Sequence, residues 1–277
     1  MRAPINKIID FSTVDGPGCR TSVFVQKCNI HCLYCHNPET QNLCINCGKC
    51  VSKCPNGALS FQNNKVIWDK NLCINCDTCI NVCENHASPK VLNLEAREVF
   101  ERILKNKPFI RGITVSGGEC SLYPDFLEEL FELCHKYNLT TLLDSNGMVK
   151  LEEHKKLMDL TDGVMLDIKS WDLNTYQKLV GFDNKNVKEN LAYLNKINKI
   201  EELRIVYVKG YVDAYNCIDG IKSVIGDNIS KVRLKLITFR QNGVKGILKD
   251  YPSPTIKDMQ DLYNYAINQG FKNVVLR

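Results

Sequence analysis

The sequence predicts an α/β protein: a partial (β/α)6 barrel with a cysteine-rich module inserted near its amino terminus. From residue 95 to residue 276, strand-like apolar runs alternate with helical runs, an order typical of a parallel sheet with outer helices. Only about six such units can be counted, too few for a closed eight-stranded barrel. Residues 43–89 break the alternation and hold eight of the 15 cysteines. We therefore expect a barrel domain made of residues 1–42 and 90–277, and an insert at 43–89.

Composition narrows the class of protein. Apolar residues make up 44% of the 277 residues and charged residues 24%, which is ordinary for a soluble protein with a sizeable core. No apolar run of ~18 residues predicts a membrane span, and the first residues lack the apolar stretch of a signal peptide. The net charge of +5 counts every cysteine as neutral, and no basic run carries interleaved aromatics. We expect a cytoplasmic protein that binds neither nucleic acid nor membrane.

The first barrel strand, residues 21–27, leads directly into a triplet of cysteines, Cys28, Cys32 and Cys35. Thiolates at this spacing can ligate three irons of a [4Fe–4S] cube and leave the fourth open to a chelating ligand. On its own, the triplet also fits a zinc site or three buried thiols.

Two further cysteine runs fill the insert, 29 residues apart, and each has the Cys-x2-Cys-x2-Cys-x3-Cys spacing of bacterial ferredoxins. Two tandem copies favour two four-cysteine [4Fe–4S] clusters over zinc, whose modules pair Cys-x2-Cys knuckles across a longer gap. In two-cluster ferredoxins the fourth cysteine of each run ligates the other cluster. One cluster is therefore predicted at Cys44, Cys47, Cys50 and Cys83, and the other at Cys73, Cys76, Cys79 and Cys54.

The remaining elements follow in order. We expect a helix at 95–106 and a second helix from Pro124 with one apolar face. A last helix is expected near 254–269. Strands are predicted at 112–116, 139–143, 163–168, 203–208, 231–237 and 271–276. The apolar face of the second helix consists of Phe126, Leu127, Leu130, Phe131 and Cys134.

Polar residues and glycines gather where these strands end: Gly117-Gly118-Glu119, Asp144, and Asp167 with Lys169. Reactive groups in parallel barrels lie at the carboxyl ends of strands. A glycine pair allows close backbone approach, carboxylates suit an ammonium or a small cation, and a lysine suits a carboxylate. Each feature alone would be a turn or a surface charge, but their joint placement predicts a site.

Together these motifs resemble a known family. The similarity covers residues 14–20 (Asp15-Gly16-Pro17-Gly18 and Arg20), the triplet through Pro38, and residues 116–119, 143–147, 164–169 and 203–210. They are similar to the activating enzymes of glycyl radical enzymes, radical S-adenosylmethionine (SAM) proteins typified by pyruvate formate-lyase activase. The insert resembles the larger branch of that family, and residues 240–246 resemble its YjjW-type members.

The resemblance implies roles for individual residues. Tyr34 to His36 would lie along the adenine, Gly117, Gly118 and Asp144 would meet the methionyl amino group, and Lys169 would take the carboxylate. Asp144, Ser145, Met165 and Asp167 could surround a monovalent cation. Arg240 stands where the pyruvate formate-lyase type has histidine. The catalytic set is Cys28, Cys32, Cys35 and Lys169, and the cofactor-binding set is Tyr34, Cys35, His36, Gly117, Gly118, Glu119, Asp144, Ser145, Met165, Asp167, Ile168, Lys169, Arg204 and Arg240.

The implied function is to form a 5′-deoxyadenosyl radical from SAM and to abstract a hydrogen from a glycine of a large partner enzyme. The implied cofactors are SAM and three [4Fe–4S] clusters, one of which binds SAM, with a flavodoxin or ferredoxin as electron donor. Two alternatives stay open: a radical SAM enzyme acting on a small molecule or peptide, and an electron carrier. Cys19, Cys120, Cys134 and Cys217 are left over and are expected to act as small apolar residues.

Overall fold

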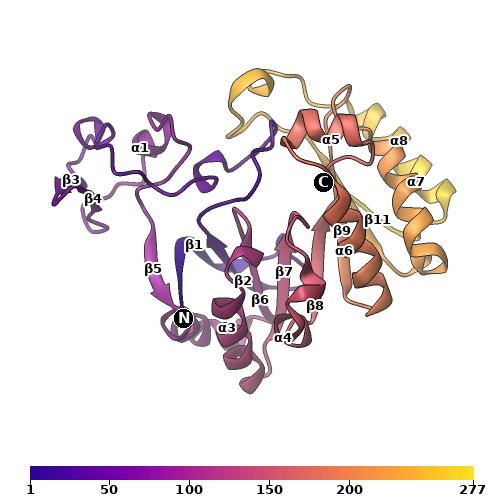
Figure 1. The fold of residues 1–277 in the computed structure, drawn as a ribbon, viewed down its shortest axis with the longest axis horizontal. Coiled ribbons are helices and arrows are strands. Elements are labelled where there is room, and N and C mark those ends of the chain that lie inside the picture. Colours follow the sequence, from indigo (N-terminus) through magenta and orange to yellow (C-terminus); the bar gives the residue numbers. More distant parts are fainter.

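Nine strands form one large open sheet in the computed structural model, which describes residues 1–277 (Figure 1). Its order is β11-β10-β9-β8-β7-β6-β2-β1-β5, so the two end strands do not pair and the barrel is not closed. All neighbours from β2 to β11 run parallel, as predicted. These strands are β2 (Arg20–Val25), β6 (Gly112–Gly117), β7 (Thr140–Ser145), β8 (Gly163–Asp167), β9 (Ile200–Tyr207), β10 (Arg233–Thr238) and β11 (Asn273–Leu276).

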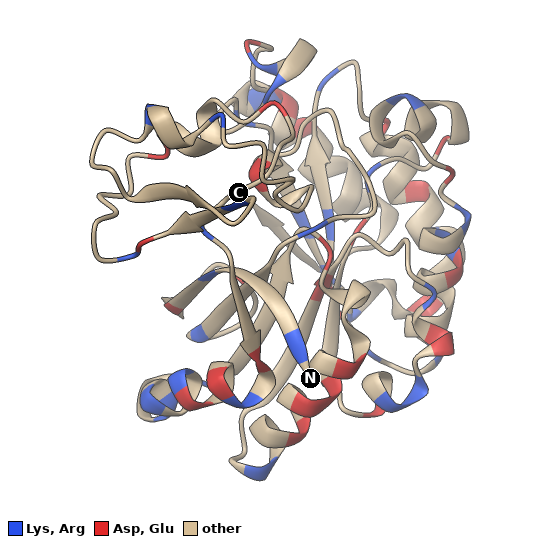
Figure 2. Cartoon of the chain, turned by 60° about the vertical axis from the view of Figure 1, so that its left-hand side comes forward, with Lys and Arg blue, Asp and Glu red and all other residues tan.

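Helices cover the outer face of this sheet, and their charged residues face outward while the strands carry few (Figure 2). The helix from Pro124 is α3, and the five residues predicted for its apolar face are all buried, which confirms that prediction. No helix is both long and apolar enough to cross a membrane. The helices are α2 (Ala96–Asn106), α3 (Pro124–Lys136), α4 (Lys155–Asp159), α5 (Leu173–Val180), α6 (Lys185–Lys196), α7 (Ala214–Ile225) and α8 (Ile256–Gln269).

Two antiparallel strands extend the sheet beyond what the sequence predicted. β1 (Arg2–Ser12) pairs with β2, and β5 (Leu92–Glu95) pairs with β1. The register of β1 against β2 shifts twice, between Ile5 and Lys7 and between Ile9 and Ser12. Each shift interrupts the two-residue period by which a strand is recognised in a sequence.

The turn between β1 and β2 contains the Asp-Gly-Pro-Gly motif and ends at a buried arginine. The guanidinium of Arg20 donates to the carbonyl oxygens of Ile113 (2.6 Å) and Thr140 (2.9 Å). Burial lowers its pKa to about 10, so Arg20 stays charged at neutral pH. The motif thus joins the starts of β2, β6 and β7, at the opposite end of the strands from the cysteine triplet.

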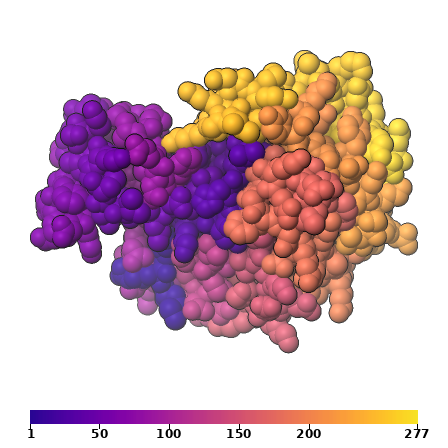
Figure 3. All heavy atoms as spheres, turned by 45° about the horizontal axis from the view of Figure 1, so that its top comes forward, coloured from indigo at the N-terminus to yellow at the C-terminus, as the bar shows by residue number.

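The insert has secondary structure of its own. β3 (Leu59–Gln62) and β4 (Lys65–Trp68) form a separate two-stranded sheet, and α1 (Thr78–Asn81) follows. A small buried cluster of Cys50, Leu59 and Cys79 is distinct from the core of the barrel. In Figure 3 the insert lies beside the barrel, and a yellow carboxyl-terminal segment reaches across to it. There Lys245 Nζ donates to the carbonyl oxygen of Ile80 at 3.3 Å.

Candidate active site

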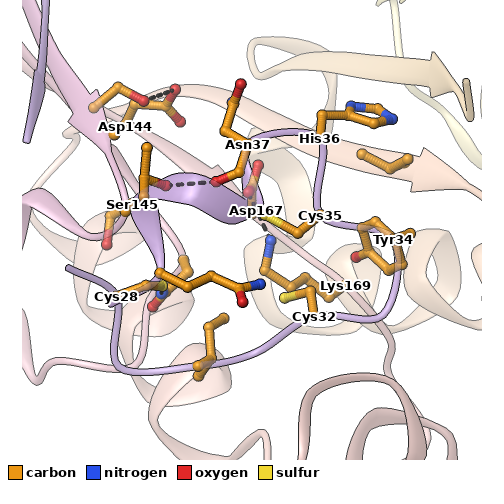
Figure 4. Close-up of a pocket in the computed structure, with 18 of the residues that line it drawn as sticks. Cys28, Cys32, Tyr34, Cys35, His36, Asn37, Asp144, Ser145, Asp167 and Lys169 are labelled. Atoms are coloured by element: carbon orange, nitrogen blue, oxygen red, sulfur yellow. Dashed lines mark hydrogen bonds and ion pairs between the residues drawn. The ribbon is translucent and has the colours of Figure 1, made fainter. Parts of the chain in front are cut away.

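A cavity of about 250 Å³ lies at the carboxyl ends of β2, β6, β7 and β8 (Figure 4). Cys28, Cys32 and Cys35 line it from the loop that follows β2. Backbone hydrogen bonds close this loop, from Lys27 to Thr40 (2.8 Å) and from Cys28 to Gln41 (2.9 Å). The triplet therefore lies at the strand ends, where the sequence predicted a site.

The three cysteines are half-buried in the wall of the cavity. Burial raises the pKa of Cys28 to about 12 and that of Cys32 to about 11, and it also raises the pKa of Cys35. Thiols in such surroundings stay protonated at neutral pH unless a bound metal supplies positive charge. Three half-buried thiols on one cavity are a donor set that fits a [4Fe–4S] cluster with one open iron.

The glycine pair after β6 packs directly on the loop after β2. A Cβ added to Gly117 would lie 2.2 Å from the carbonyl oxygen of Val25, and one added to Gly118 would lie 2.1 Å from that of Lys27. Any larger residue would push the strand end and the triplet loop apart. The pair therefore both lines the cavity and permits the loop to approach.

Two ion pairs carry the charge in the cavity. Lys169 Nζ lies 2.9 Å from Asp167 Oδ2, and Arg204 Nη1 lies 2.8 Å from Asp144 Oδ2. Burial disfavours the charged form of Lys169, but Asp167, Cys32 and Tyr34 together outweigh it, and the pKa of Lys169 lies well above its usual value. Burial also raises the pKa of Asp144, although Arg204 acts in the opposite direction. A cavity with two acidic and two basic groups suits a zwitterionic ligand such as an amino acid.

Most of the predicted site residues meet at this cavity. Alternation along the strand ending at Asp167 predicted that Asp167 and Lys169 share a side, and their ion pair confirms it. The predicted residues that line the cavity are Cys28, Cys32, Tyr34, Cys35, His36, Gly117, Gly118, Asp144, Ser145, Asp167, Lys169 and Arg204.

Four predicted residues do not line it: Glu119, Met165, Ile168 and Arg240. The carboxylate of Glu119 is buried behind the cavity, where it accepts hydrogen bonds from Ser145 Oγ (2.9 Å) and the backbone amide of Asn146 (2.7 Å). Its side chain thus holds the end of β7 in place, and its contact with a cofactor stays a prediction.

Met165, Ile168 and Arg240 lie outside the cavity for separate reasons. Met165 is buried under Arg204, whose Nη2 lies 3.0 Å from its sulfur, and Ile168 is fully buried. Arg240 lies beyond His36, and its carbonyl oxygen is 2.9 Å from His36 Nε2. No three His, Cys, Asp or Glu side chains are arranged to hold one metal ion. A four-iron cube holds its thiolates further apart than one ion does, so this finding bears on the predicted cation, which stays a prediction.

The sequence did not reveal several lining residues. Asn146 Nδ2 lies 3.5 Å from Cys28 Sγ, and Gln41 reaches the cavity because the loop closes through backbone hydrogen bonds. Neither has a signal in the sequence. Val206 could have been predicted as a lining residue, because it lies two residues after Arg204 along β9 and so points to the same side of the strand.

The insert cysteines surround two smaller cavities. The first, of about 110 Å³, is lined by Cys44, Cys47, Cys50 and Cys83, and also by Cys79, which lines both cavities. The second, of about 20 Å³, is lined by Cys54, Cys73, Cys76 and Cys79. This grouping matches the crossed arrangement predicted from the spacing, while ligation itself stays a prediction.

The backbone around these cysteines repeats as the sequence does. Asn46 and Gly48 of the first run have positive φ (57° and 74°), as do Asn75 and Asp77, their counterparts 29 residues on (56° and 57°). Backbone amides approach sulfur in the first run, from Asn46 to Cys44 (3.4 Å) and from Ala58 to Cys54 (3.2 Å). Amides aimed at sulfur are the surroundings that a thiolate ligand needs.

This geometry defines a class of protein: an enzyme whose partial parallel barrel holds a three-thiol cluster site beside a pocket for a zwitterion. Residues 22–215 match the family model described as the Radical SAM superfamily, and the chain belongs to that superfamily.

The names of individual relatives are more specific than that of the superfamily. The chain is 32% identical to the 4-hydroxyphenylacetate decarboxylase activating enzyme of Clostridioides difficile over 84% of this chain and 80% of that protein. It is 32% identical to the pyruvate formate-lyase-activating enzyme of Streptococcus mutans over 76% of this chain and 66% of that protein. The crystal structure of Streptococcus suis SuiB bound to precursor peptide SuiA is similar with a TM-score of 0.60 at 13% identity, over 91% of this chain and 47% of that one. The likeness to SuiB supports the fold alone.

Proposed function

We propose that this chain is an activating enzyme that places a radical on a glycine of a separate glycyl radical enzyme. The observation that carries the proposal is the cavity in which three half-buried thiols meet the Gly117-Gly118 pair and the two ion pairs. Similarity to two activating enzymes over three quarters or more of the chain supports the same activity.

The residues fit a [4Fe–4S] cluster at Cys28, Cys32 and Cys35, with SAM in the rest of the cavity. When bound, a reduced cluster held by these cysteines would supply one electron to the sulfonium of SAM, and the resulting cleavage to methionine and a 5′-deoxyadenosyl radical would provide the group that accepts a hydrogen atom from the partner's glycine Cα.

The protein's part is to bind, orient and exclude water. Lys169 donates only one of its three N–H groups to Asp167, so it can also donate to the ligand's carboxylate. Gly117 and Gly118 present backbone rather than side chain to the ligand. His36, whose ring stacks on Phe239 with centroids 6.1 Å apart, offers a flat surface for the adenine.

We extend the proposal to the insert as a ferredoxin-like module with two auxiliary [4Fe–4S] clusters. Its own hairpin, its own buried cluster and its two cysteine-lined cavities support a separate unit at 43–89. This insert favours the larger branch of the activating enzymes, and residues 240–246 favour the YjjW type. A flavodoxin or ferredoxin would supply the electrons. All 15 cysteines are free of disulfides, which suits a reducing, cytoplasmic compartment.

The rival is a radical SAM enzyme that acts on a small molecule or peptide, because it would use the same cavity. The deciding experiment is anaerobic co-purification of the reconstituted holoenzyme with its partner, followed by reduction, addition of SAM and electron paramagnetic resonance. We expect a glycyl radical doublet on the partner, and none with the matched variant Cys32→Ala. SAM cleavage without a radical on any co-purified protein would favour the rival.

A further inference from the structure

The two cysteine-lined cavities of the insert differ at one strand, β4. Val66 lines the first insert cavity and Trp68 lines the second. These residues are two positions apart on β4, so their side chains lie on the same side of the strand. The strand therefore presents an apolar side chain to one cavity and an indole to the other, although the cysteine runs around the two cavities repeat each other.

Charge does not distinguish the two insert cavities. Each is lined by one lysine and one acidic residue, and in each the two side chains form an ion pair. Lys49 pairs with Glu84 at 2.6 Å beside the first cavity, and Lys90 pairs with Asp77 beside the second. Because each pair is close to neutral, a group bound in either cavity would meet a similar balance of charge.

Hydrogen-bond donors do distinguish them. The backbone amide of Ala58 lies 3.2 Å from Cys54 Sγ, and Thr78 Oγ1 lies 3.3 Å from Cys76 Sγ, and both of these sulfurs belong to the second insert cavity. The first insert cavity has one such contact, from a backbone amide to Cys44 Sγ. Donors to sulfur are therefore more numerous around the second cavity.

The indole N–H of Trp68 is a further donor on the same side. Its nitrogen is buried and has no acceptor within hydrogen-bond distance, while the ring packs against Cys50, Leu59 and Cys79. Trp68 also lines an open groove of about 580 Å³ beside β1 and β5, but an N–H that faced this groove would be exposed to water. A buried N–H without an acceptor is costly. Sulfur in the second insert cavity is the acceptor that its surroundings offer.

We propose that the indole N–H of Trp68 donates a hydrogen bond to a sulfur of the cluster held in the second insert cavity, and makes it the more easily reduced of the two auxiliary clusters. The inference rests on the proposed ferredoxin-like module and adds an order of reduction within it. One electron adds one negative charge to a cluster, and a donor to its sulfur stabilises that charge, which raises the reduction potential. Val66 offers no donor to the first cluster, so an electron delivered to the insert settles on the second.

A redox titration of the reconstituted holoenzyme, followed by electron paramagnetic resonance, tests the order of reduction. Trp68→Phe keeps an aromatic ring and removes the donor. We expect it to lower the potential of one auxiliary cluster by about 59 mV, which corresponds to about a tenfold change in a one-electron equilibrium. The potential of the other auxiliary cluster should not change. Trp171→Phe makes the same substitution at the only other tryptophan, which lines neither insert cavity, and should change no potential.

A second measurement uses the wild-type holoenzyme and so does not depend on the folding of Trp68→Phe. Tryptophan labelled with ¹⁵N at the indole nitrogen is incorporated, and electron–nuclear double resonance is recorded on the reduced protein. We expect a ¹⁵N coupling to a reduced cluster. It should persist in Trp171→Phe and in Cys47→Ala, which removes a ligand of the first cluster, and disappear in Cys76→Ala, which removes a ligand of the second.

The outcomes separate this inference from the proposed module. About 12 irons per chain without a ¹⁵N coupling, or with unchanged potentials in Trp68→Phe, would overturn the inference alone. A coupling lost in Cys47→Ala and kept in Cys76→Ala would assign Trp68 to the first cluster and also overturn it. Zinc in place of the insert's iron would overturn the proposed module, and this inference with it.

Discussion

At the scale of single residues, the charges of the site depend on partners that are distant in sequence. Alternation predicts that Asp167 and Lys169 share a side, and their ion pair agrees. The pairing of Arg204 with Asp144 joins two different strands and has no local signal. Glu119 was predicted as a ligand contact, yet it is buried, and Ser145 at the end of β7 and Asn146 after it donate to its carboxylate.

Replacing Lys169 by alanine should weaken SAM binding by about 1.5–3 kcal/mol, the range for a hydrogen bond to a charged group. The substitution also leaves Asp167 without its buried cation, which adds repulsion toward the ligand's carboxylate. Equilibrium dialysis with the reconstituted protein measures the effect. The double variant Lys169→Ala with Asp167→Asn is the control that removes this repulsion, and unchanged SAM affinity in the single variant would show that Lys169 does not meet the ligand.

At the scale of elements, the parallel strands and the helices α2, α3 and α8 were predicted because each repeats a simple period, whereas α4, α5, α6 and α7 were not predicted. β1 and β5 could not be predicted, since β1 breaks register twice and β5 is four residues long. The hairpin of the insert was missed as well, although Asn63 and Asn64 at its turn have positive φ, as a tight two-residue turn requires. Cysteine spacing dominated the prediction of that region and hid the weaker strand signal.

The segment after β10 holds the triplet loop in place. Gly243 has φ +81°, and a Cβ added there would lie 2.1 Å from the carbonyl oxygen of His36. Next to it, Val244 is buried and Lys245 reaches the insert. The segment thus contacts both the triplet loop and the insert.

Gly243→Ala should therefore weaken SAM binding by about tenfold or more, because the backbone of His36 must move to relieve the clash. Gly246→Ala is the matched control: its φ is +72° and nothing lies within 4 Å of the added Cβ, so only backbone strain is introduced. Hydrogen exchange of residues 240–248, measured beside SAM affinity, should increase more in Gly243→Ala. Equal effects of the two substitutions would mean that the segment does not position His36.

At the scale of the whole molecule, the open barrel and the insert were both evident from the sequence, but their contact was not. The contact depends on Lys245 and Ile80, which are 165 positions apart. A hollow lined by Val14 and Arg277 likewise exists only because the two sides of the sheet curve toward each other. The curvature of an open sheet is set by the sum of the twists between its strands, which no single motif encodes.

Anaerobic reconstitution should load about 12 irons per chain, four in each of three clusters. Cys32→Ala should keep about eight, since the insert cysteines lie in separate cavities. Iron and zinc are measured together by plasma emission spectroscopy. About four irons with zinc making up the difference would show that the insert is a zinc module.

The crossed ligation of the insert is the most specific structural prediction. Cys83 belongs to the second run but lies with the first three cysteines of the first run, and Cys54 lies with the second. If the ligands follow this grouping, Cys83→Ala should release about four irons and expose Cys44, Cys47 and Cys50 to alkylation. Cys54→Ala should instead expose Cys73, Cys76 and Cys79, and mass spectrometry after iodoacetamide treatment identifies the labelled set. Cys19→Ala, a cysteine outside all three cavities, should release no iron. Labelling of Cys73, Cys76 and Cys79 in Cys83→Ala would mean that each run holds its own cluster, and that the two halves of the insert are not tied together through their metals.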